Sequence, residues 1–213
     1  MDSRAVREAM VHKLVARGLQ HPVVQQAFLA IERHRFVDSG LVAQAYEDTS
    51  LPIGWGQTIS KPSVVARMLE LLCDGHTGRL GRVLEIGTGC GYQAAQLSHL
   101  CREVYSMERV KGLHERAREN LRPLRLPNVH LIFGDGMSGF PSGAPYAGIV
   151  AAAGGRDLPT AWLEQLAVGA RLVAPAELVP GQQSLVVVER TPSGYVKNVL
   201  EAVLFVPLKS GVA

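Results

Sequence analysis

The chain has 213 residues, of which 47% are hydrophobic and 19% charged, and its formal net charge is +3 at pH 7. This length suits one domain, and this composition excludes a disordered or collagen-like chain. The net charge is small and acidic residues lie between the clustered basic ones, which argues against a nucleic-acid-binding surface. No apolar run approaches the roughly 20 residues that span a bilayer, and the first residues lack the apolar block of a secretory signal. We therefore expect a cytoplasmic protein that binds neither nucleic acid nor membrane.

Residues 1–80 predict helices and a loop. Apolar residues recur at helical spacing over 4–17, and a second helix is expected over 20–36. The segment 51–62, LPIGWGQTISKP, is dense in Gly, Pro, Thr and Ser and predicts a loop. A helix over 62–72 follows. These elements would form an N-terminal cap on the rest of the chain.

From residue 82 the pattern alternates between short apolar runs and amphipathic helices. The predicted strands cover 82–87, 102–108, 128–136, 146–155 and 170–176. Strands alternating with helices specify a parallel sheet wound on both faces. Two further β-rich segments, joined by the turn sequence TPSG, predict an antiparallel hairpin at the sheet edge. This plan matches class I methyltransferases.

A glycine-rich turn follows the first predicted strand and opens a helix. It consists of Glu85, Ile86, Gly87, Thr88, Gly89, Cys90 and Gly91. Glycines let the backbone approach a ligand closely, and N–H groups at a helix start can face its polar atoms. The G-x-G-x-G spacing differs from the G-x-G-x-x-G dinucleotide fingerprint, and the lack of GK[ST] excludes a P-loop.

Acidic residues end the next two predicted strands. Glu108 is placed to accept hydrogen bonds from ribose hydroxyls, and Asp135 with Gly136 is placed to edge an adenine ring. Separately, Glu108 could be only a helix N-terminal charge and Asp135–Gly136 only a turn. Together with the glycine turn, at the carboxyl ends of neighbouring strands, they predict a nucleoside site.

The segment 51–62 carries hydroxyl groups just ahead of a predicted helix. Ser60 lies just before a predicted helix, and from physics alone it is expected only to cap that helix. Trp55, between two glycines, would either close over a substrate or serve as a packing anchor.

The three cysteines predict neither disulfides nor a metal site. Cys73, Cys90 and Cys101 are odd in number, lack CxxC spacing and form no ligand pattern with the seven histidines. We expect free thiols. A helix-start position could lower the pKa of Cys90, although a small spacer is the simpler interpretation.

Five segments resemble, in their order and spacing, those of the protein-L-isoaspartate (D-aspartate) O-methyltransferase family. They read LPIGWGQTISKP, VLEIGTGCGYQAAQL, YSMERVKGL, FGDGMSGFP and EAVLFVPL. The GQTIS string is specific to this family, whereas many methyltransferases share the glycine turn. The resemblance covers nearly the whole chain.

The resemblance implies a single methyltransferase domain over residues 1–213. Residues 1–80 would carry the N-terminal helices and the substrate loop, and residues 81–213 the core. The fold would be the α/β, Rossmann-like fold of class I S-adenosylmethionine-dependent methyltransferases: a doubly wound, mostly parallel sheet with a C-terminal antiparallel hairpin and an N-terminal helical cap.

The resemblance also implies the reaction. Such enzymes transfer the methyl group of S-adenosyl-L-methionine to the α-carboxylate of L-isoaspartyl and D-aspartyl residues in damaged proteins, leaving S-adenosyl-L-homocysteine. The ester closes to a succinimide, whose hydrolysis returns some normal aspartate. The partners would be isoaspartyl proteins and peptides, and the enzyme a monomer.

Site residues follow from the resemblance position by position. Ser60 matches the active-site serine, and Thr58 and Ile59 match residues at the junction of cofactor and peptide. Cofactor binding falls on Glu85, Gly87, Thr88, Gly89, Gly91, Glu108, Asp135 and Gly136, together with Thr58 and Ile59, and the bordering residues on the peptide side are Val206, Pro207 and Leu208. No metal is implied.

Little catalytic machinery is needed for this reaction. The nucleophile is a carboxylate with an unperturbed pKa of about 3.5 to 4, so it is ionised at neutral pH and requires no general base. Catalysis would come from holding oxygen, methyl carbon and sulfur in line. The Ser60 hydroxyl would donate a hydrogen bond that orients the carboxylate.

The sequence departs from the family pattern at Ala147, Gly154, Gly155 and Glu177. These changes would alter the geometry of one wall of the site relative to the family pattern. A methyltransferase of the same fold with another carboxylate or small-molecule substrate stays an alternative, as does a non-catalytic S-adenosylmethionine-binding module.

Overall fold

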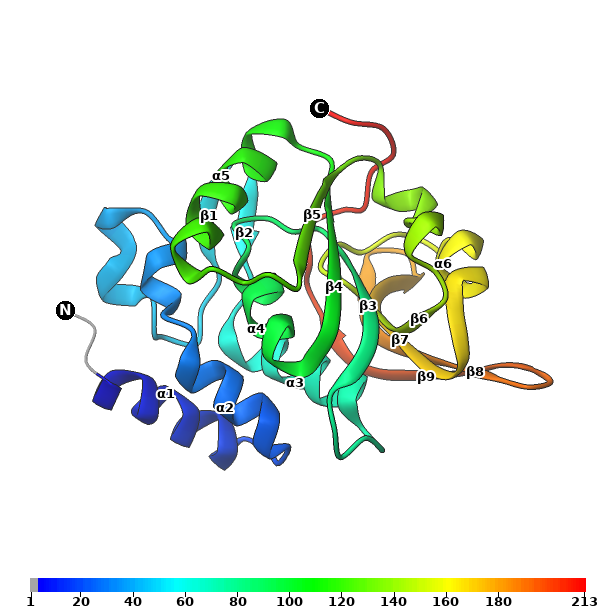
Figure 1. Cartoon of the computed structure of the whole chain (residues 1–213), viewed down its shortest axis with the longest axis horizontal. Coiled ribbons are helices and arrows are strands. Elements are labelled where there is room, and N and C mark those ends of the chain that lie inside the picture. Colours follow the sequence, from blue (N-terminus) through cyan, green and yellow to red (C-terminus); the bar gives the residue numbers. More distant parts are fainter. Residues whose placement is uncertain (1–3) are drawn as a thin grey trace.

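The computed structural model describes residues 4–213 and is built around a seven-stranded sheet (Figure 1). The strands are β3 (Leu80–Ile86), β4 (Cys101–Glu108), β5 (Val129–Phe133), β6 (Tyr146–Ala151), β7 (Leu166–Val179), β8 (Gln182–Thr191) and β9 (Gly194–Val203). They lie in the order β5-β4-β3-β6-β7-β8-β9, parallel from β5 to β7 and antiparallel from β7 to β9. The predicted parallel sheet with a C-terminal antiparallel hairpin is confirmed.

Helices cover both faces of the sheet. They are α1 (Arg4–Ala16), α2 (Pro22–Ala30), α3 (Pro62–Cys73), α4 (Tyr92–Leu100), α5 (Lys111–Leu121) and α6 (Thr160–Gln165), with short 3-10 turns at Arg33–Phe36, Ser39–Gln44, Arg122–Leu124, Gly136–Ser138 and Pro141–Gly143. Successive strand residues point to opposite faces, so in β3 Val83 packs with α1 to α4, while Leu84 packs with Trp162 of α6. Within residues 4–213, no helix combines the length and apolar character that a membrane span requires.

The second predicted helix is shorter than expected. It ends at Ala30, and Ile31 is extended, with φ −98° and ψ 121°. Leaving the helix lets Ile31 and Phe36 both bury their side chains in a cluster around Tyr92. Arg33 is fully buried there, with its guanidinium 5.0 Å from the centre of the Tyr92 ring. Tertiary packing therefore overrides the helical spacing.

The segment expected to be a loop is largely a β-hairpin. Strands β1 (Leu51–Gly54) and β2 (Gln57–Ile59) pair antiparallel. Trp55 and Gly56 both have positive φ, at 51° and 68°, as a two-residue hairpin turn requires. The hairpin forms because alternate residues, Leu51, Ile53 and Ile59, are buried in the cluster around Tyr92.

Candidate functional site

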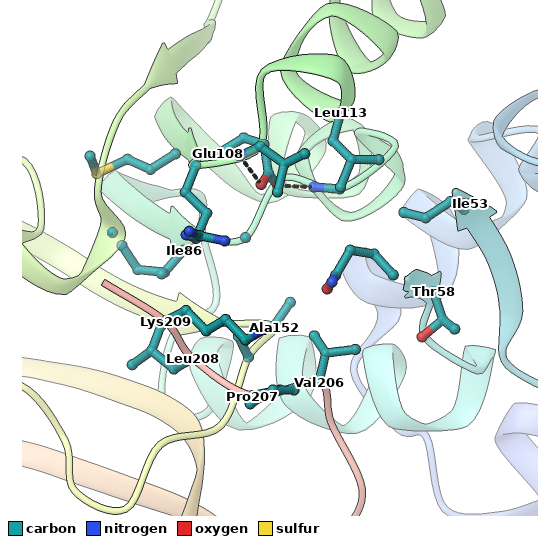
Figure 2. Close-up of a pocket in the computed structure, with 18 residues that line it drawn as sticks. Ile53, Thr58, Ile86, Glu108, Leu113, Ala152, Val206, Pro207, Leu208 and Lys209 are labelled. Carbon is teal, nitrogen blue, oxygen red and sulfur yellow. Dashed lines mark hydrogen bonds between the residues drawn. The ribbon is translucent and has the colours of Figure 1, made fainter. Parts of the chain in front are cut away.

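A cavity opens at the carboxyl ends of β3, β4 and β6, beside the β1–β2 hairpin (Figure 2). Its walls come from those strand ends, from the hairpin, from Gly136 after β5 and from segment 206–209. Ligands of doubly wound sheets bind at this edge. The structure thus brings the glycine turn, Glu108 at the end of β4, and Gly136 around one cavity.

The glycine turn forms the floor of this cavity. Gly87 and Gly89 line it and have positive φ of 91° and 56°, a region that other residues rarely adopt. The N–H groups of Gly87 and Thr88 both donate to the carbonyl oxygen of Met107, at 2.9 and 3.1 Å. These bonds fix the turn against the end of β4.

Glu108 lines the cavity although only 5% of its surface is exposed. Its Oε2 accepts the N–H of Gly89 at 2.8 Å, and its Oε1 accepts the N–H of Val110 at 2.9 Å, as Figure 2 shows. An ionised carboxylate has about four acceptor sites. Glu108 therefore braces the turn and retains acceptor capacity for ligand hydroxyls.

The predicted cofactor residues Ile59, Glu85, Thr88, Gly91 and Asp135 do not line the cavity. Glu85 and Thr88 are 0% and 4% exposed beneath the turn, and Gly91 is the N-cap of α4. The hydroxyl of Ser106 donates to Glu85 and lies 2.6 Å from that of Thr88. Burial raises the pKa of Glu85 to about 8, against hydrogen bonds from Ser106 and Gln93. A protonated Glu85 therefore supports the turn from behind at neutral pH.

Asp135 has protein partners for both carboxylate oxygens. Oδ1 accepts the N–H of Met137 at 2.8 Å, and Oδ2 accepts the N–H of Gly211 at 2.7 Å. The next residue, Gly136, does line the cavity, and a Cβ there would lie 2.6 Å from Cγ2 of Ile86. The adenine contact of Asp135 therefore stays a prediction, with Gly136 supplying the surface next to the cavity.

The segment after Leu208 runs along the start of α5. The Arg109 Nε donates to the Gly211 oxygen at 2.8 Å, the Lys111 N–H to the Ala213 oxygen at 2.7 Å, and the Ala213 N–H to the Arg109 oxygen at 2.8 Å. The sequence carries no signal for this contact, because it joins residues about a hundred positions apart and has no local motif.

Three consecutive residues of the predicted substrate loop differ in orientation. Thr58 is exposed and lines the cavity, as Figure 2 shows. Ile59 is 5% exposed and its side chain belongs to the apolar cluster around Tyr92. Ser60 is half-buried and lines a neighbouring groove. The alternation of β2 therefore leaves Thr58 and Ser60 with accessible side chains and buries Ile59 between them.

The expectation that Ser60 caps the next helix is wrong. Lys61 is the N-cap of α3 and makes no side-chain capping bond. Instead the carboxylate of Asp48 accepts the N–H of Ser63 at 2.8 Å, which satisfies a free donor of the first turn. Within residues 4–213 the Ser60 hydroxyl has no hydrogen-bond partner, so it is available to a ligand.

We call this neighbouring cavity the Ser60 groove. It is lined by Ser50, Thr58, Ser60, Lys61, Val64, Ala152 and residues 202–206. Thr58, Ala152 and Val206 also line the cavity at the glycine turn. The two cavities therefore meet at these three side chains.

Val206, Pro207 and Leu208 line the first cavity, as the resemblance implied for a site border. They are not part of a regular strand, because β9 ends at Val203. The N–H of Gly154 donates to the Val206 oxygen at 3.0 Å, and the Gly154 oxygen accepts the N–H of Leu208 at 2.8 Å. One isolated bridge thus replaces the predicted strand pairing.

The departures from the family pattern fall in two places. Ala147 lies near the start of β6, where its Cβ is 3.2 Å from a Cβ built on Gly81, at the end of the sheet opposite the cavity. Gly154 positions the segment that borders the cavity, and the Gly155 carbonyl accepts the N–H of Glu177 at 2.8 Å. Of these departures, only those at Gly154, Gly155 and Glu177 therefore concern the wall of the site.

One wall of the cavity is apolar and was not predicted from the sequence. Ile86, Met107, Val110 and Leu113 line the cavity around Glu108. The apolar spacing of the α5 sequence was the available signal for Leu113, but it indicates only which face is inward. Whether that face meets a core or a cavity depends on the neighbouring hairpin.

The hairpin is docked on α5 through Trp55. A Cβ added to Gly112 would lie 2.2 Å from Cζ2 of Trp55, so the indole lies directly against this glycine. Arg116 Nη1 donates to the Ile53 oxygen at 2.8 Å, and its Nη2 donates to Asp38 at 2.8 Å. This contact supports the packing-anchor interpretation of Trp55.

All three cysteines are free, as expected, and all three are buried. Burial raises the pKa of Cys73 to about 12 and that of Cys90 to about 11. The alternative that Cys90 is an activated thiol is therefore wrong, since burial outweighs its place at a helix start. Across residues 4–213 no cluster of three or more His, Cys, Asp or Glu residues could hold a metal ion.

Comparison with known proteins assigns the family. The family model described as protein-L-isoaspartate(D-aspartate) O-methyltransferase (PCMT) matches residues 5–213. The chain belongs to the PCMT family. Curated PCMT relatives include a protein-L-isoaspartate O-methyltransferase from Burkholderia thailandensis, 60% identical over the whole chain, and one from Burkholderia vietnamiensis, 59% identical. The chain spans 64% and 69% of the length of these two relatives.

Solved PCMT structures have the same fold. One named protein-L-isoaspartate O-methyltransferase superposes with a TM-score of 0.87 at 29% identity and covers 97% of this chain and 67% of its own. A putative enzyme from Plasmodium falciparum, in complex with S-adenosyl-L-homocysteine, gives 0.81 at 24% identity and covers 95% and 98%. The class I methyltransferase fold expected from sequence is confirmed.

Proposed function

We propose that the protein methylates the α-carboxylate of L-isoaspartyl and D-aspartyl residues in damaged proteins, using S-adenosyl-L-methionine. The ester would close to a succinimide without further catalysis and so begin repair. One observation carries the proposal: the Ser60 groove meets the glycine-turn cavity at Thr58, Ala152 and Val206. A carboxylate beside Ser60 would therefore adjoin a ligand in that cavity. The names of the PCMT relatives support the same reaction.

The cavity has the donor and acceptor set that the cofactor requires. Gly87 and Gly89 present backbone without side chains, Glu108 retains acceptor capacity for ribose hydroxyls, and the apolar wall suits an adenine ring. Asp135 with Gly136 would edge the ring, while Glu85, Thr88 and Gly91 support the turn. S-adenosylmethionine, when bound, supplies an electrophilic methyl group. The Plasmodium structure with S-adenosyl-L-homocysteine supports this choice of ligand.

The residues of the substrate side orient an already reactive nucleophile. The isoaspartyl carboxylate, with an unperturbed pKa of about 3.5 to 4, needs no base at neutral pH. The unpartnered Ser60 hydroxyl would donate a hydrogen bond to one carboxylate oxygen and direct the other towards the cofactor cavity. Val206, Pro207 and Leu208, together with the apolar wall, would keep water from the reacting atoms.

A single-domain, monomeric, cytoplasmic enzyme is part of the proposal. The single domain is supported by the main core, in which side chains of α1, α2 and α3 pack with those of the sheet. The monomer rests on the family resemblance alone, and sedimentation equilibrium would measure it.

Methyl transfer from labelled cofactor to an isoaspartyl peptide tests the proposed reaction. The matched control is the same peptide with a normal aspartyl residue. We expect base-labile label on the isoaspartyl peptide only. Label on other carboxylates or small molecules would support a different substrate, and cofactor binding without any transfer would support a non-catalytic module.

A further inference from the structure

A second groove continues from the Ser60 groove, on the side away from the glycine turn. It lies between α1, α3 and the β8–β9 edge of the sheet, and it shares Lys61, Val64, Ala202 and Val203 with the Ser60 groove. Its volume is about 380 Å³, against the roughly 10–15 Å³ that a single water needs. We call it the α1–α3 groove, and it has room for side chains of a bound peptide.

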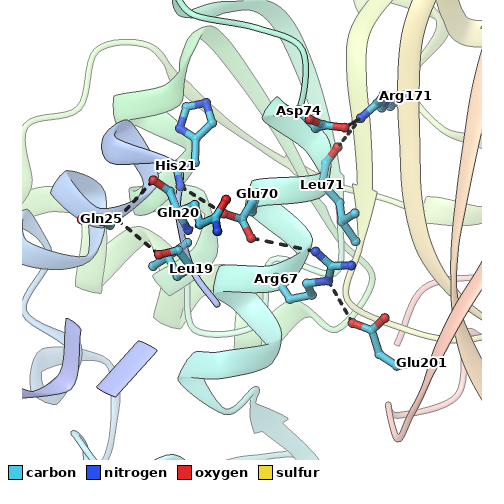
Figure 3. A network of polar contacts seen from close by, with 10 residues as sticks. All are labelled: Leu19, Gln20, His21, Gln25, Arg67, Glu70, Leu71, Asp74, Arg171 and Glu201. Carbon is cyan, nitrogen blue, oxygen red and sulfur yellow. Dashed lines mark hydrogen bonds and ion pairs between the residues drawn. The ribbon is translucent and has the colours of Figure 1, made fainter. Parts of the chain in front are cut away.

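Most charges around the α1–α3 groove are compensated within the protein, as Figure 3 shows for Arg67. Arg67 Nε pairs with Glu201 at 3.0 Å and its Nη1 lies 3.9 Å from Glu70. Arg17 pairs with Asp48. Glu70 also accepts the N–H groups of residues 20 and 21, at 2.6 and 3.0 Å, which fixes it on the groove wall.

Lys61 is the exception. It is exposed, lines both grooves and directly follows Ser60 in the chain. Among residues 4–213 no carboxylate forms an ion pair with its ammonium group. An uncompensated cation between two connected grooves favours an anion at that position over a neutral or cationic group.

We propose that the α1–α3 groove binds the peptide segment flanking the isoaspartyl residue, and that Lys61 selects segments carrying an acidic side chain there. This inference rests on the proposed function, because it needs a polypeptide at Ser60. The α1–α3 groove gives a polypeptide held at Ser60 a path out of the Ser60 groove, since the two grooves share four lining residues. β9 forms one side of this path, and within the described residues 4–213 it is the terminal strand of the sheet, with no strand paired along its outer edge. Lys61 is a specificity residue in this scheme and does not touch the reacting atoms.

The inference is tested by measuring the kinetics of a series of peptides in which a single acidic residue occupies a different position in each. A neutral isoaspartyl peptide would carry one Glu at each of three positions on either side, with Gln at the same position as the control. We expect Glu at one or more positions on one side to lower the peptide KM about 1.5- to 5-fold relative to Gln, the range of an exposed ion pair. The kcat and the KM for S-adenosylmethionine should not change, and added salt should remove the difference.

Variants assign the effect to Lys61. Lys61→Met should abolish the difference between Glu and Gln peptides, and Lys61→Arg should restore it. Lys197→Met removes an equal charge from an exposed position of β9 outside both grooves and should leave the difference intact.

Two results would overturn the inference. One is a wild-type enzyme that methylates all peptides with no Glu position lowering KM, a result that needs no variant. The other is a Lys61→Met enzyme whose KM rises equally for Glu and Gln peptides, which would place Lys61 on the isoaspartyl carboxylate. If the wild-type enzyme methylates no isoaspartyl peptide at all, the proposed function itself fails.

Discussion

The glycine turn and the β1–β2 hairpin border the same cavity (Figure 2), and Ser60, which follows the hairpin, lines the neighbouring groove. The polar groups on the two sides differ in whether the protein already provides their hydrogen-bond partners. On the turn side, Glu108 accepts two backbone N–H groups, and Glu85, Ser106 and Thr88 form a buried hydrogen-bonded chain. On the other side, the Ser60 hydroxyl has no partner within residues 4–213. The contrast indicates a cofactor half that is organised by the protein and a substrate half completed by its ligand.

Each half should therefore respond to substitution in its own way. On the turn side, a change removes support for a preformed site and should weaken cofactor binding or stability. On the Ser60 side, a change removes a contact that only the substrate makes, and should lower turnover without unfolding the protein.

Ser60→Ala should give the largest effect and the sharpest separation of the halves. We expect turnover on an isoaspartyl peptide to fall about a hundredfold, the scale for loss of one well-placed donor. The Kd for S-adenosyl-L-homocysteine, measured by isothermal titration calorimetry, should stay within about twofold. Ser193→Ala, in the exposed β8–β9 turn, is the control. An equal loss of both quantities would contradict the role of Ser60.

Glu108→Gln tests the turn side. A neutral amide has one acceptor oxygen and cannot replace both carboxylate bonds to Gly89 and Val110. We expect the Kd for S-adenosyl-L-homocysteine to rise about tenfold to a hundredfold, since hydrogen bonds to charged groups contribute about 1.5–3 kcal/mol. Glu115→Gln, on the exposed side of α5, should change the Kd little. An unchanged Kd in Glu108→Gln would remove this residue from the cofactor site.

Glu85→Gln should change the pH dependence of stability. The pKa of Glu85 is raised from 4.5 in its ordinary state to about 8, because the carboxylate is buried. Its native state keeps a proton that the unfolded state loses, so this group stabilises most below about pH 4.5 and its contribution falls as pH rises towards 8. The slope is about 1.4 kcal/mol per pH unit. Denaturant titrations between pH 5 and 8 should show a shallower decline in Glu85→Gln; parallel profiles would refute the assignment.

Gly112→Ala should give the smallest effect. The new Cβ would collide with Trp55 and displace the hairpin, at about 1 kcal/mol of stability, because the exposed indole can move aside. In a Trp55→Ala background the same change should be neutral or stabilising, since alanine favours helix. Urea unfolding of the four proteins measures the coupling. Equal effects in both backgrounds would exclude the contact.

The parallel sheet was predictable because each strand and helix carries a local period. The runs ending at Gly87, Glu108 and Asp135 predict that the glycine turn and both acids lie at one edge of the sheet. Parallel strands fix that geometry, because their carboxyl ends must meet on the same side.

The substrate half was harder to predict because its structure depends on long-range packing. The glycines of residues 51–59 predict a loop, yet this segment forms a hairpin because Leu51, Ile53 and Ile59 are buried. Likewise, the Asp135 bond to Gly211 and the capping of α3 by Asp48 join residues with no shared pattern. The position of Glu85 in the motif predicts a ligand contact, but the alternation of side chains along β3 buries its carboxylate beneath the turn.

The boundary between the two cavities has a consequence for inhibitor chemistry. It consists of a threonine, an alanine and a valine, at positions 58, 152 and 206, with few atoms between the compartments. An adenosine derivative bearing a short arm with a terminal carboxylate would therefore occupy both compartments at once. Its two ends would bind with an effective local concentration in the millimolar range, so one compact molecule would gain affinity that neither fragment has alone.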